Sequence, residues 1–204
     1  MAETDDISRY LNRRAPTRIV YDGETGRRGR AEWIGDDFAT EATCDLDRLA
    51  EILAGVSPAA LIATPTGQRP ARDIRRGDRV VARDAGQAVV TRSLRLTFGW
   101  RDIGLLPILA PRRIQAGALG AGLPVSDLVL SGGQRIVAAQ RGAPSGTASD
   151  TCPVDAIAEM AGIGVDRHLH EAQYQLIVLE REDMLLVEGV WCASCPAALI
   201  AGPR

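Results

Sequence analysis

The stretch SPAALIATPTGQRPARDIRRGDRVVARD, residues 57–84, predicts short strands joined by tight turns. In TPTG, residues 64–67, proline takes the second position and glycine the fourth, as a type I turn prefers. RRGD, residues 75–78, is a second turn and leads directly into the strand-like run RVVAR. Two turns so close together leave room only for short strands, which is typical of an all-β domain.

Short strands continue along the rest of the chain. Between Leu94 and Phe98, apolar side chains alternate with polar ones, as in a strand that is buried on one face. The segments DLVLSGGQRIVAA (127–139) and YQLIVLEREDMLLVEGVW (174–191) each predict two strands joined by a turn. We therefore predict a mostly β domain over about residues 57–196.

Two segments between these strands have other predicted structures. A short helix is predicted from about Val154 to Ala161, where Gly162 closes it. The glycine-rich run GALGAGLP (117–124) lacks the lysine and hydroxyl residue that follow a phosphate-binding loop. This run is therefore interpreted as a turn.

The N-terminal region differs from the strand-rich part. Residues 18–34, RIVYDGETGRRGRAEWI, place a glycine-rich turn between two extended stretches and predict a hairpin. A helix is predicted over residues 45–54, with Asp45 as its cap and Gly55 at its end. Four apolar side chains fall on one face of this helix: Leu46, Leu49, Ile52 and Leu53.

Composition limits the partners that we expect. The chain has 204 residues, enough to bury a core without disulfides or metal, and a formal net charge of only −2. This charge gives no general attraction to nucleic acid or to an anionic membrane. No apolar run reaches the roughly 18 residues of a membrane helix, and the start MAETDDISRY does not resemble a signal peptide. We expect no membrane partner, no nucleic acid, and a location in the cytoplasm or within an assembly.

The four cysteines, Cys44, Cys152, Cys192 and Cys195, are spaced too irregularly for a disulfide framework. Reduced thiols are the expected state, and no cofactor or metal is expected. One alternative is a structural zinc site, because CASC has the spacing of half such a site. Its remaining ligands would come from Cys152 and from His168 and His170.

The order of these segments resembles the Hint module, the self-processing domain shared by hedgehog proteins and inteins, in its bacterial form. The resemblance rests on LIATPTGQRPARDIRRGDRVVARD, RRIQAGALGAGLPVSDLVLSGGQRIV and YQLIVLEREDMLLVEGVW. It implies a curved, compact all-β domain with short helices. We place this domain at residues 55–204, after an N-terminal α/β appendage at residues 1–54.

The resemblance also implies a reaction. A cysteine or serine that heads the first block attacks the carbonyl carbon of the preceding peptide bond and converts the amide into a thioester or ester. A histidine in a later block protonates the departing nitrogen.

This chain differs from the family pattern at the positions that carry the reaction. Gly55 takes the place of the nucleophile, and Gln134, in SGGQR, takes the place of the histidine. An amide does not act as a general acid near neutral pH. The other altered positions are Ala59 and Ala60, where the family has Gly-Thr, and Gln175 and Glu182, which are often histidine in relatives. The sequence therefore predicts a Hint-fold protein that has lost self-cleavage and serves as a structural or protein-binding part of a larger assembly.

Two alternative functions remain at this point. Ser57 is a displaced nucleophile for self-cleavage in one of them, although it lies two residues closer to the first strand than the family's nucleophile, and a surface serine in a turn is the commoner role. The other is a carbohydrate- or nucleic-acid-binding module. Its contacts would come from three tryptophans, which are more often core or interface residues, or from a cluster of arginines: Trp33, Trp100 and Trp191, or Arg69, Arg72, Arg75, Arg76, Arg79 and Arg83.

Overall fold

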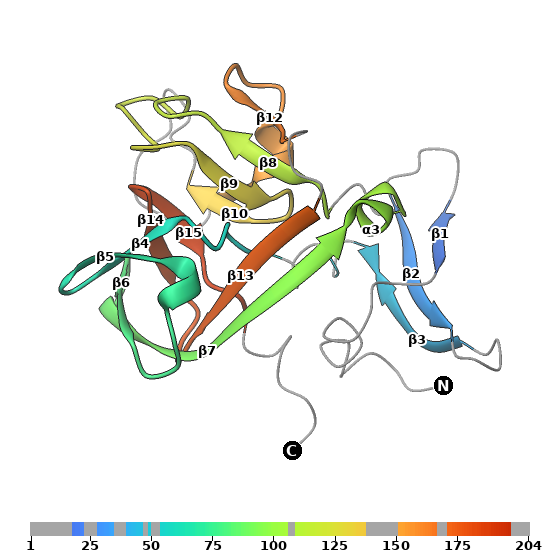
Figure 1. Cartoon of the computed structure of the whole chain (residues 1–204), viewed down its shortest axis with the longest axis horizontal. Helices are drawn as coiled ribbons and strands as arrows, with labels where there is room; N and C mark the ends of the chain where they lie inside the picture. The colour runs from blue at the N-terminus through green and yellow to red at the C-terminus, as the bar shows by residue number, and fades with distance from the viewer. Residues whose placement is uncertain are drawn as a thin grey trace.

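The computed structural model describes residues 18–22, 28–34, 40–46, 49, 54–105, 109–137, 151–166 and 171–196. As predicted, these residues form a mostly β structure with short helical segments (Figure 1). None of the helices in these ranges is long and apolar enough to cross a membrane.

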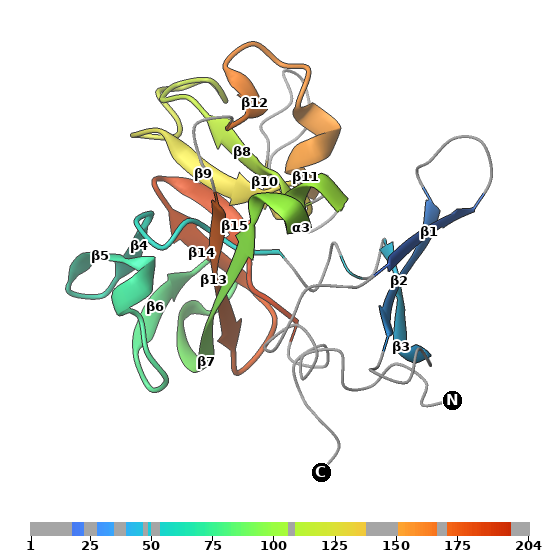
Figure 2. The same cartoon turned by 45° about the vertical axis from the view of Figure 1, so that its right-hand side comes forward.

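A three-stranded antiparallel sheet forms the N-terminal part. Its strands are β1 (Arg18–Asp22), β2 (Arg28–Ile34) and β3 (Thr40–Asp45), in that order. β1 and β2 pair as the predicted hairpin. In two views that differ by 45°, this sheet lies at the side of the larger β structure (Figures 1 and 2).

The largest sheet contains nine strands. Seven of them follow the order β11-β10-β15-β14-β6-β7-β13, and the hairpin of β4 and β5 joins this path at β14. The predicted turn at residues 64–67 connects β4 to β5. The bounds are β4 (Leu61–Thr64), β5 (Gly67–Pro70), β6 (Arg79–Ala82), β7 (Gly86–Gly99), β10 (Arg135–Val137), β11 (Thr151–Pro153), β13 (Glu171–Leu179), β14 (Met184–Val187) and β15 (Val190–Ala193).

A third sheet has the order β12-β8-β9, formed by β12 (Ile163–Val165), β8 (Pro111–Ile114) and β9 (Leu128–Ser131). The helical segments between strands are η1 (Ala71–Asp73), α3 (Trp100–Leu105) and η4 (Val154–Ile157). The glycine-rich run between β8 and β9 forms turns, as predicted.

The helix predicted at residues 154–161 is only partly correct. The chain forms one 3₁₀ turn, η4, and then continues in further turns. The amide of Met160 donates to the carbonyl of Ile157, and the amide of Ile163 donates to that of Met160. These bonds span three residues instead of the four of an α-helix, so a regular helix does not propagate.

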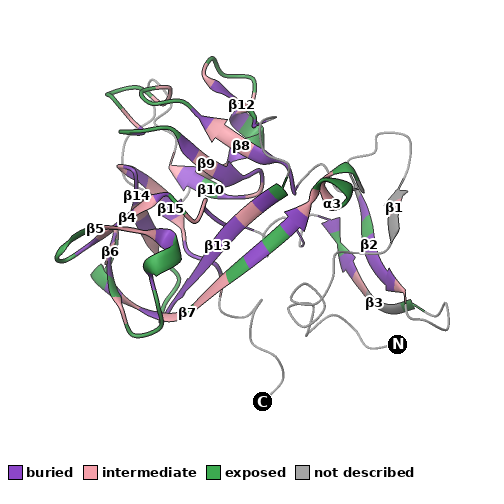
Figure 3. Ribbon diagram, in the orientation of Figure 1, coloured by how far each residue is buried: buried purple, intermediate pink, exposed green. Residues whose placement is uncertain are grey.

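Two hydrophobic cores lie on opposite faces of the long ribbon formed by β7 and β13. Figure 3 shows buried residues along both strands. Ile177 and Leu179 face the first core, which fills the domain after residue 55. Tyr174, Leu176 and Val178 alternate with them along β13 and face the second core.

The second core joins the N-terminal part to the domain. Trp33 and Leu49 are fully buried there with Phe98 and Tyr174. Leu46 and Leu49 are helical and buried, which confirms the predicted apolar face at these two positions. Ile52 and Leu53 lie outside the described residues. The chain has left the helix by Ala54.

Candidate functional site

Residues 55–57 form a short extended segment between two sheets. Val56 exchanges two main-chain hydrogen bonds with Gln175 of β13, at 3.1 and 2.8 Å. On the opposite side, the amide of Ser57 donates to the carbonyl of Val129, and the amide of Ser131 donates to the carbonyl of Gly55. The position that the resemblance assigns to the nucleophile is therefore held from both sides, by β13 and by β9.

Gly55 is a glycine because the chain passes close to β13. A Cβ atom built on Gly55 would lie 2.9 Å from Cβ of Tyr174 and 3.0 Å from Cδ1 of Leu176. Both of these side chains belong to the second core and are almost completely buried. The amide of Gly55 also donates to Oγ of Ser131, at 3.1 Å. The position is therefore closed to any side chain unless the core shifts.

Gln134, at the position of the family's histidine, is 1% exposed. Its Nε2 donates one hydrogen bond to the carbonyl of Arg135, at 3.0 Å, and one to the carbonyl of Ala193, at 2.9 Å. Both amide protons are thus used inside the fold, where they connect β10 to β15. The side chain has a structural role in this arrangement.

The remaining altered positions fall in different surroundings. Gln175 is buried, and its Nε2 donates to Oγ of Ser93 at 2.7 Å. Glu182 lies in the exposed turn between β13 and β14. Ala59 is exposed, whereas Ala60 is buried in the first core. The structure therefore brings Gly55 and Gln175 onto neighbouring strands but leaves Glu182 in a surface turn.

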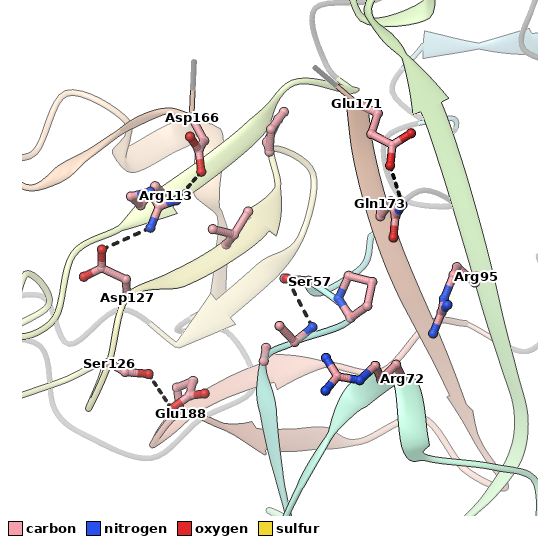
Figure 4. Close-up of a pocket in the computed structure, with 15 residues that line it drawn as sticks. Ser57, Arg72, Arg95, Arg113, Ser126, Asp127, Asp166, Glu171, Gln173 and Glu188 are labelled. Carbon is pink, nitrogen blue, oxygen red and sulfur yellow. Dashed lines mark hydrogen bonds and ion pairs between the residues drawn. The ribbon is translucent and has the colours of Figure 1, made fainter. Parts of the chain in front are cut away.

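A cleft of about 630 Å³ opens beside residues 57–60 (Figure 4). Ser57 lines it, and Oγ of Ser57 accepts a hydrogen bond from the amide of Ala59 at 3.3 Å. This is the local bond of a serine in a turn. The described residues include no histidine that could act as a base for Ser57.

Glu188 also lines the cleft, and the sequence reasoning did not select it. Its side chain is buried, with Oε1 accepting from the amide of Leu61 and Oε2 from Oγ of Ser126, both at 2.8 Å. Its φ angle is +48°, an uncommon backbone conformation for a residue with a side chain. The one signal in the sequence was the Glu-Gly pair that contributes to the resemblance. Glu188 connects β4 to the segment that precedes β9.

An arginine between two carboxylates forms the opposite wall of the cleft. Arg113 pairs with Asp166, which is buried, and with Asp127, at 3.1 Å. The amide of Ala116 and the guanidinium of Arg113 hold the pKa of Asp127 below its usual value. The pKa of Arg113 is raised, mainly by its hydrogen bond to Asp166. One arginine thus serves two carboxylates, and this group of three side chains has a formal net charge of −1.

The cysteines of CASC are divided between the two cores. Cys192 is buried in the first core and Cys195 in the second. Burial raises the pKa of both thiols, that of Cys195 to about 12. No group of three or more metal-binding side chains occurs among the residues that the structure describes, and the four cysteines, which all lie there, form no disulfide with one another. His168 and His170 lie outside those residues.

The tryptophans of the alternative binding module lie in separate places, and one arginine of its cluster, Arg69, is held in an ion pair. Trp33 is buried in the second core, Trp100 is 68% exposed on α3, and Trp191 is half-buried on β15. Arg69 pairs with Asp78 at 3.1 Å. Within the described part of the chain, the three tryptophans thus do not form one stacking surface.

The match to a family model decides the assignment: the model of the Hint domain covers residues 55–198. The chain belongs to the Hint domain family. The predicted resemblance is thereby confirmed, and the match starts at Gly55.

Among solved structures, the chain is similar to two inteins. The crystal structure of the gp41-1 intein aligns with 12% identity and a TM-score of 0.46, over 69% of this chain and 98% of the intein. The crystal structure of the MchDnaB-1 intein aligns with 10% identity and a TM-score of 0.43, over 68% and 98%. No curated protein matches the chain.

Proposed function

We propose that this Hint domain does not cleave itself and serves as a structural or protein-binding part of a larger assembly. The observation that carries this proposal is the lack of space at Gly55. A nucleophile needs at least a Cβ atom, and that atom would lie 2.9 Å from the Cβ of Tyr174. The packing of the second core therefore opposes a cysteine or serine at the position from which the family's reaction starts.

The hydrogen bonds around the two peptide bonds that a reaction would break also support the proposal. The Ala54–Gly55 bond lies between two buried residues, and the amide of Gly55 is bonded to Ser131. The alternative nucleophile Ser57 would attack the Val56–Ser57 peptide bond, and this peptide group forms hydrogen bonds on both sides. Its carbonyl accepts from Gln175, and its amide donates to Val129. Either reaction would have to disrupt these sheet contacts.

The shared second core favours a chain that stays in one piece. Trp33 and Leu49 pack in one cluster with Phe98 and Tyr174. Cleavage before Gly55 would leave the first pair and the second pair on two different chains. Burial of large apolar side chains contributes a sizeable part of the stability of a domain. The N-terminal part and the Hint domain therefore support each other as long as the chain is intact.

The first prediction tests this proposal by mass spectrometry of the purified chain. We expect the mass to stay at 21.8 kDa after incubation with dithiothreitol or hydroxylamine, which release thioester and ester intermediates of self-cleavage. Fragments ending at Ala54 or Val56 would contradict the proposal. In that case a Ser57→Ala variant identifies the nucleophile, because only a reaction through Ser57 stops in it.

A further inference from the structure

The cleft contains an unpaired stretch of strand edge on β13. Gln175 directs both of its main-chain hydrogen bonds to Val56, away from β7. Main-chain groups alternate in direction along a strand, and the register between β13 and β7 is regular from residue 171 to residue 178. The main-chain groups of Gln173 and Glu171 therefore point to the same side as those of Gln175. No described residue forms a main-chain hydrogen bond with them there.

The strand that pairs with this edge stops abruptly. Residues 55–57 lie between β13 and β9, and the chain then turns away at Pro58. Beyond the turn, Gln173 and Glu171 of β13 line one side of the cleft, and Val129 and Asp127 line the other. The space that a middle strand would occupy between β13 and β9 therefore continues beyond the turn as the open cleft. Its volume of about 630 Å³ is within the range of ligand sites.

The exposed charges at the turn end of the cleft are positive, whereas the carboxylate of Glu188 at this end is buried. Arg72 lines the cleft, and its guanidinium has no hydrogen bond or ion pair with any described residue. Among the described residues, Arg95 donates only to the neutral amide of Gln175, at 3.4 Å. Both arginines lie on the side of β13 and the 57–60 turn, whereas Arg113 and its two carboxylates lie opposite (Figure 4).

The acidic side chains of the cleft are engaged or lie farther along it. Asp127 and Asp166 share Arg113, and Glu188 accepts from Leu61 and Ser126. Glu171 accepts from Nε2 of Gln173 and keeps its charge. It stands at the far end of the open edge from Arg72 (Figure 4). A negative ligand group is therefore favoured beside Arg72 and Arg95 and disfavoured beside Glu171.

We propose that the cleft binds an extended acidic peptide of a partner protein, which adds to the open edge of β13 as an antiparallel strand. Its main chain pairs with Gln173 and Glu171, as in other cases of strand addition. Its N-terminal end lies next to the 57–60 turn, where an Asp or Glu side chain meets Arg72 and Arg95. This inference rests on the proposed protein-binding function and names the surface and the chemistry of the partner.

The test uses two fluorescein-labelled pentapeptides with amidated C-termini and fluorescence anisotropy on the full chain. The peptide Glu-Val-Thr-Val-Thr should bind about two- to fivefold more tightly than Gln-Val-Thr-Val-Thr, because Arg72 and Arg95 are exposed and ion pairs between exposed charges are weak. The reversed peptide Thr-Val-Thr-Val-Glu places its carboxylate near Glu171 and should bind more weakly than the first. Raising the salt concentration should reduce the advantage of the first peptide.

Variants of the protein locate the binding site. Arg72→Gln and Arg95→Gln should each remove most of the preference for Glu over Gln in the peptide. Arg76→Gln is the matched control, because Arg76 is an exposed arginine of a nearby turn that does not line the cleft. An equal effect of all three substitutions would overturn the proposal, since it would indicate attraction to surface charge in general.

The strand pairing has its own test. A peptide with N-methyl groups at alternate residues cannot pair with β13 and should lose binding, although its side chains are unchanged. Gln173→Pro removes the outward-facing amide but no bond to β7, whereas Gln173→Ala keeps that amide. Binding that survives both N-methylation and Gln173→Pro would overturn strand addition.

Intact mass is measured on the same samples. An intact chain that binds none of the peptides contradicts this inference alone, whereas a cleaved chain contradicts the proposed function.

Discussion

Gly55 lies where the chain passes close to the second core. Substituting it with Cys introduces a Cβ within 2.9 Å of Tyr174 and a sulfur that needs still more space. We expect Gly55→Cys to lower the free energy of unfolding by about 1–3 kcal/mol, as overpacking of cores typically does. We also expect no efficient cleavage, because Gln134 supplies no acid. Urea unfolding and mass spectrometry measure the two effects.

Gly164→Ala is a suitable control for this substitution. Gly164 lies in β12, and a Cβ built there meets no atom within 4 Å. We expect the control to change stability by less than about 0.5 kcal/mol, the usual range for surface sites. Rapid cleavage of the Gly55→Cys variant would show that the scaffold had remained competent and that only the nucleophile was missing.

Single residues also show which features of the candidate site could be predicted from the sequence alone. The altered positions Gly55 and Gln134 could be found from the resemblance to the Hint family, whose sequence blocks were laid on this chain. The lack of space at Gly55 could not, because it depends on Tyr174 and Leu176, which follow far along the chain. The role of Glu188 likewise depends on contacts with distant segments, so no local pattern predicted it.

The helix that precedes the Hint domain is an element whose stability should depend on the domain. A helix of about ten residues is marginal by itself and gains stability by burying an apolar face. Leu49 is fully buried in the second core. We expect Leu49→Ala to cost about 2–4 kcal/mol in the free energy of unfolding. Val125→Ala, at a residue that is 67% exposed, is the control and should have little effect.

A loss of less than about 0.5 kcal/mol in Leu49→Ala would contradict the packing of this helix on the domain. It would suggest that the helix docks on a partner instead.

At the level of elements, strands and turns were easier to predict than helices. The turns at residues 64–67 and 75–78 were correct because proline and glycine determine the local backbone. The short helix α3 was not predicted, since its six residues include Gly104 and have no helical repeat. Oδ2 of Asp102 accepts a hydrogen bond from the amide of Gly99 at its start, and the long ribbon of β7 and β13 positions it. Contacts outside the segment therefore decide its conformation.

The whole molecule places a protonated thiol in each of its two cores, and this predicts a loss of stability in alkali. Burial raises the pKa of Cys192 and raises that of Cys195 to about 12. In the unfolded chain both thiols ionise near pH 8.5. Above that pH the folded state binds more protons than the unfolded state, so the free energy of unfolding falls as the pH rises. The stabilisation that comes from keeping these two thiols protonated is complete below about pH 8.5. It is lost progressively above that pH, toward the folded pKa of about 12 for Cys195.

Urea unfolding at pH 7 to 10 in the presence of a reducing agent measures this loss, with an upper slope of about 1.4 kcal/mol per pH unit for each thiol. The window ends near pH 10, where tyrosines begin to ionise in the unfolded chain. Cys192→Ala with Cys195→Ala should reduce the pH dependence, whereas Cys152→Ala should keep most of it, because Cys152 is only half-buried. A zinc held by CASC would keep its cysteine ligands ionised in the folded state, so stability would rise with pH up to about 8.5 and then level off. A profile of this shape in the unsubstituted chain would therefore contradict the division of these cysteines between two cores and favour a shared site.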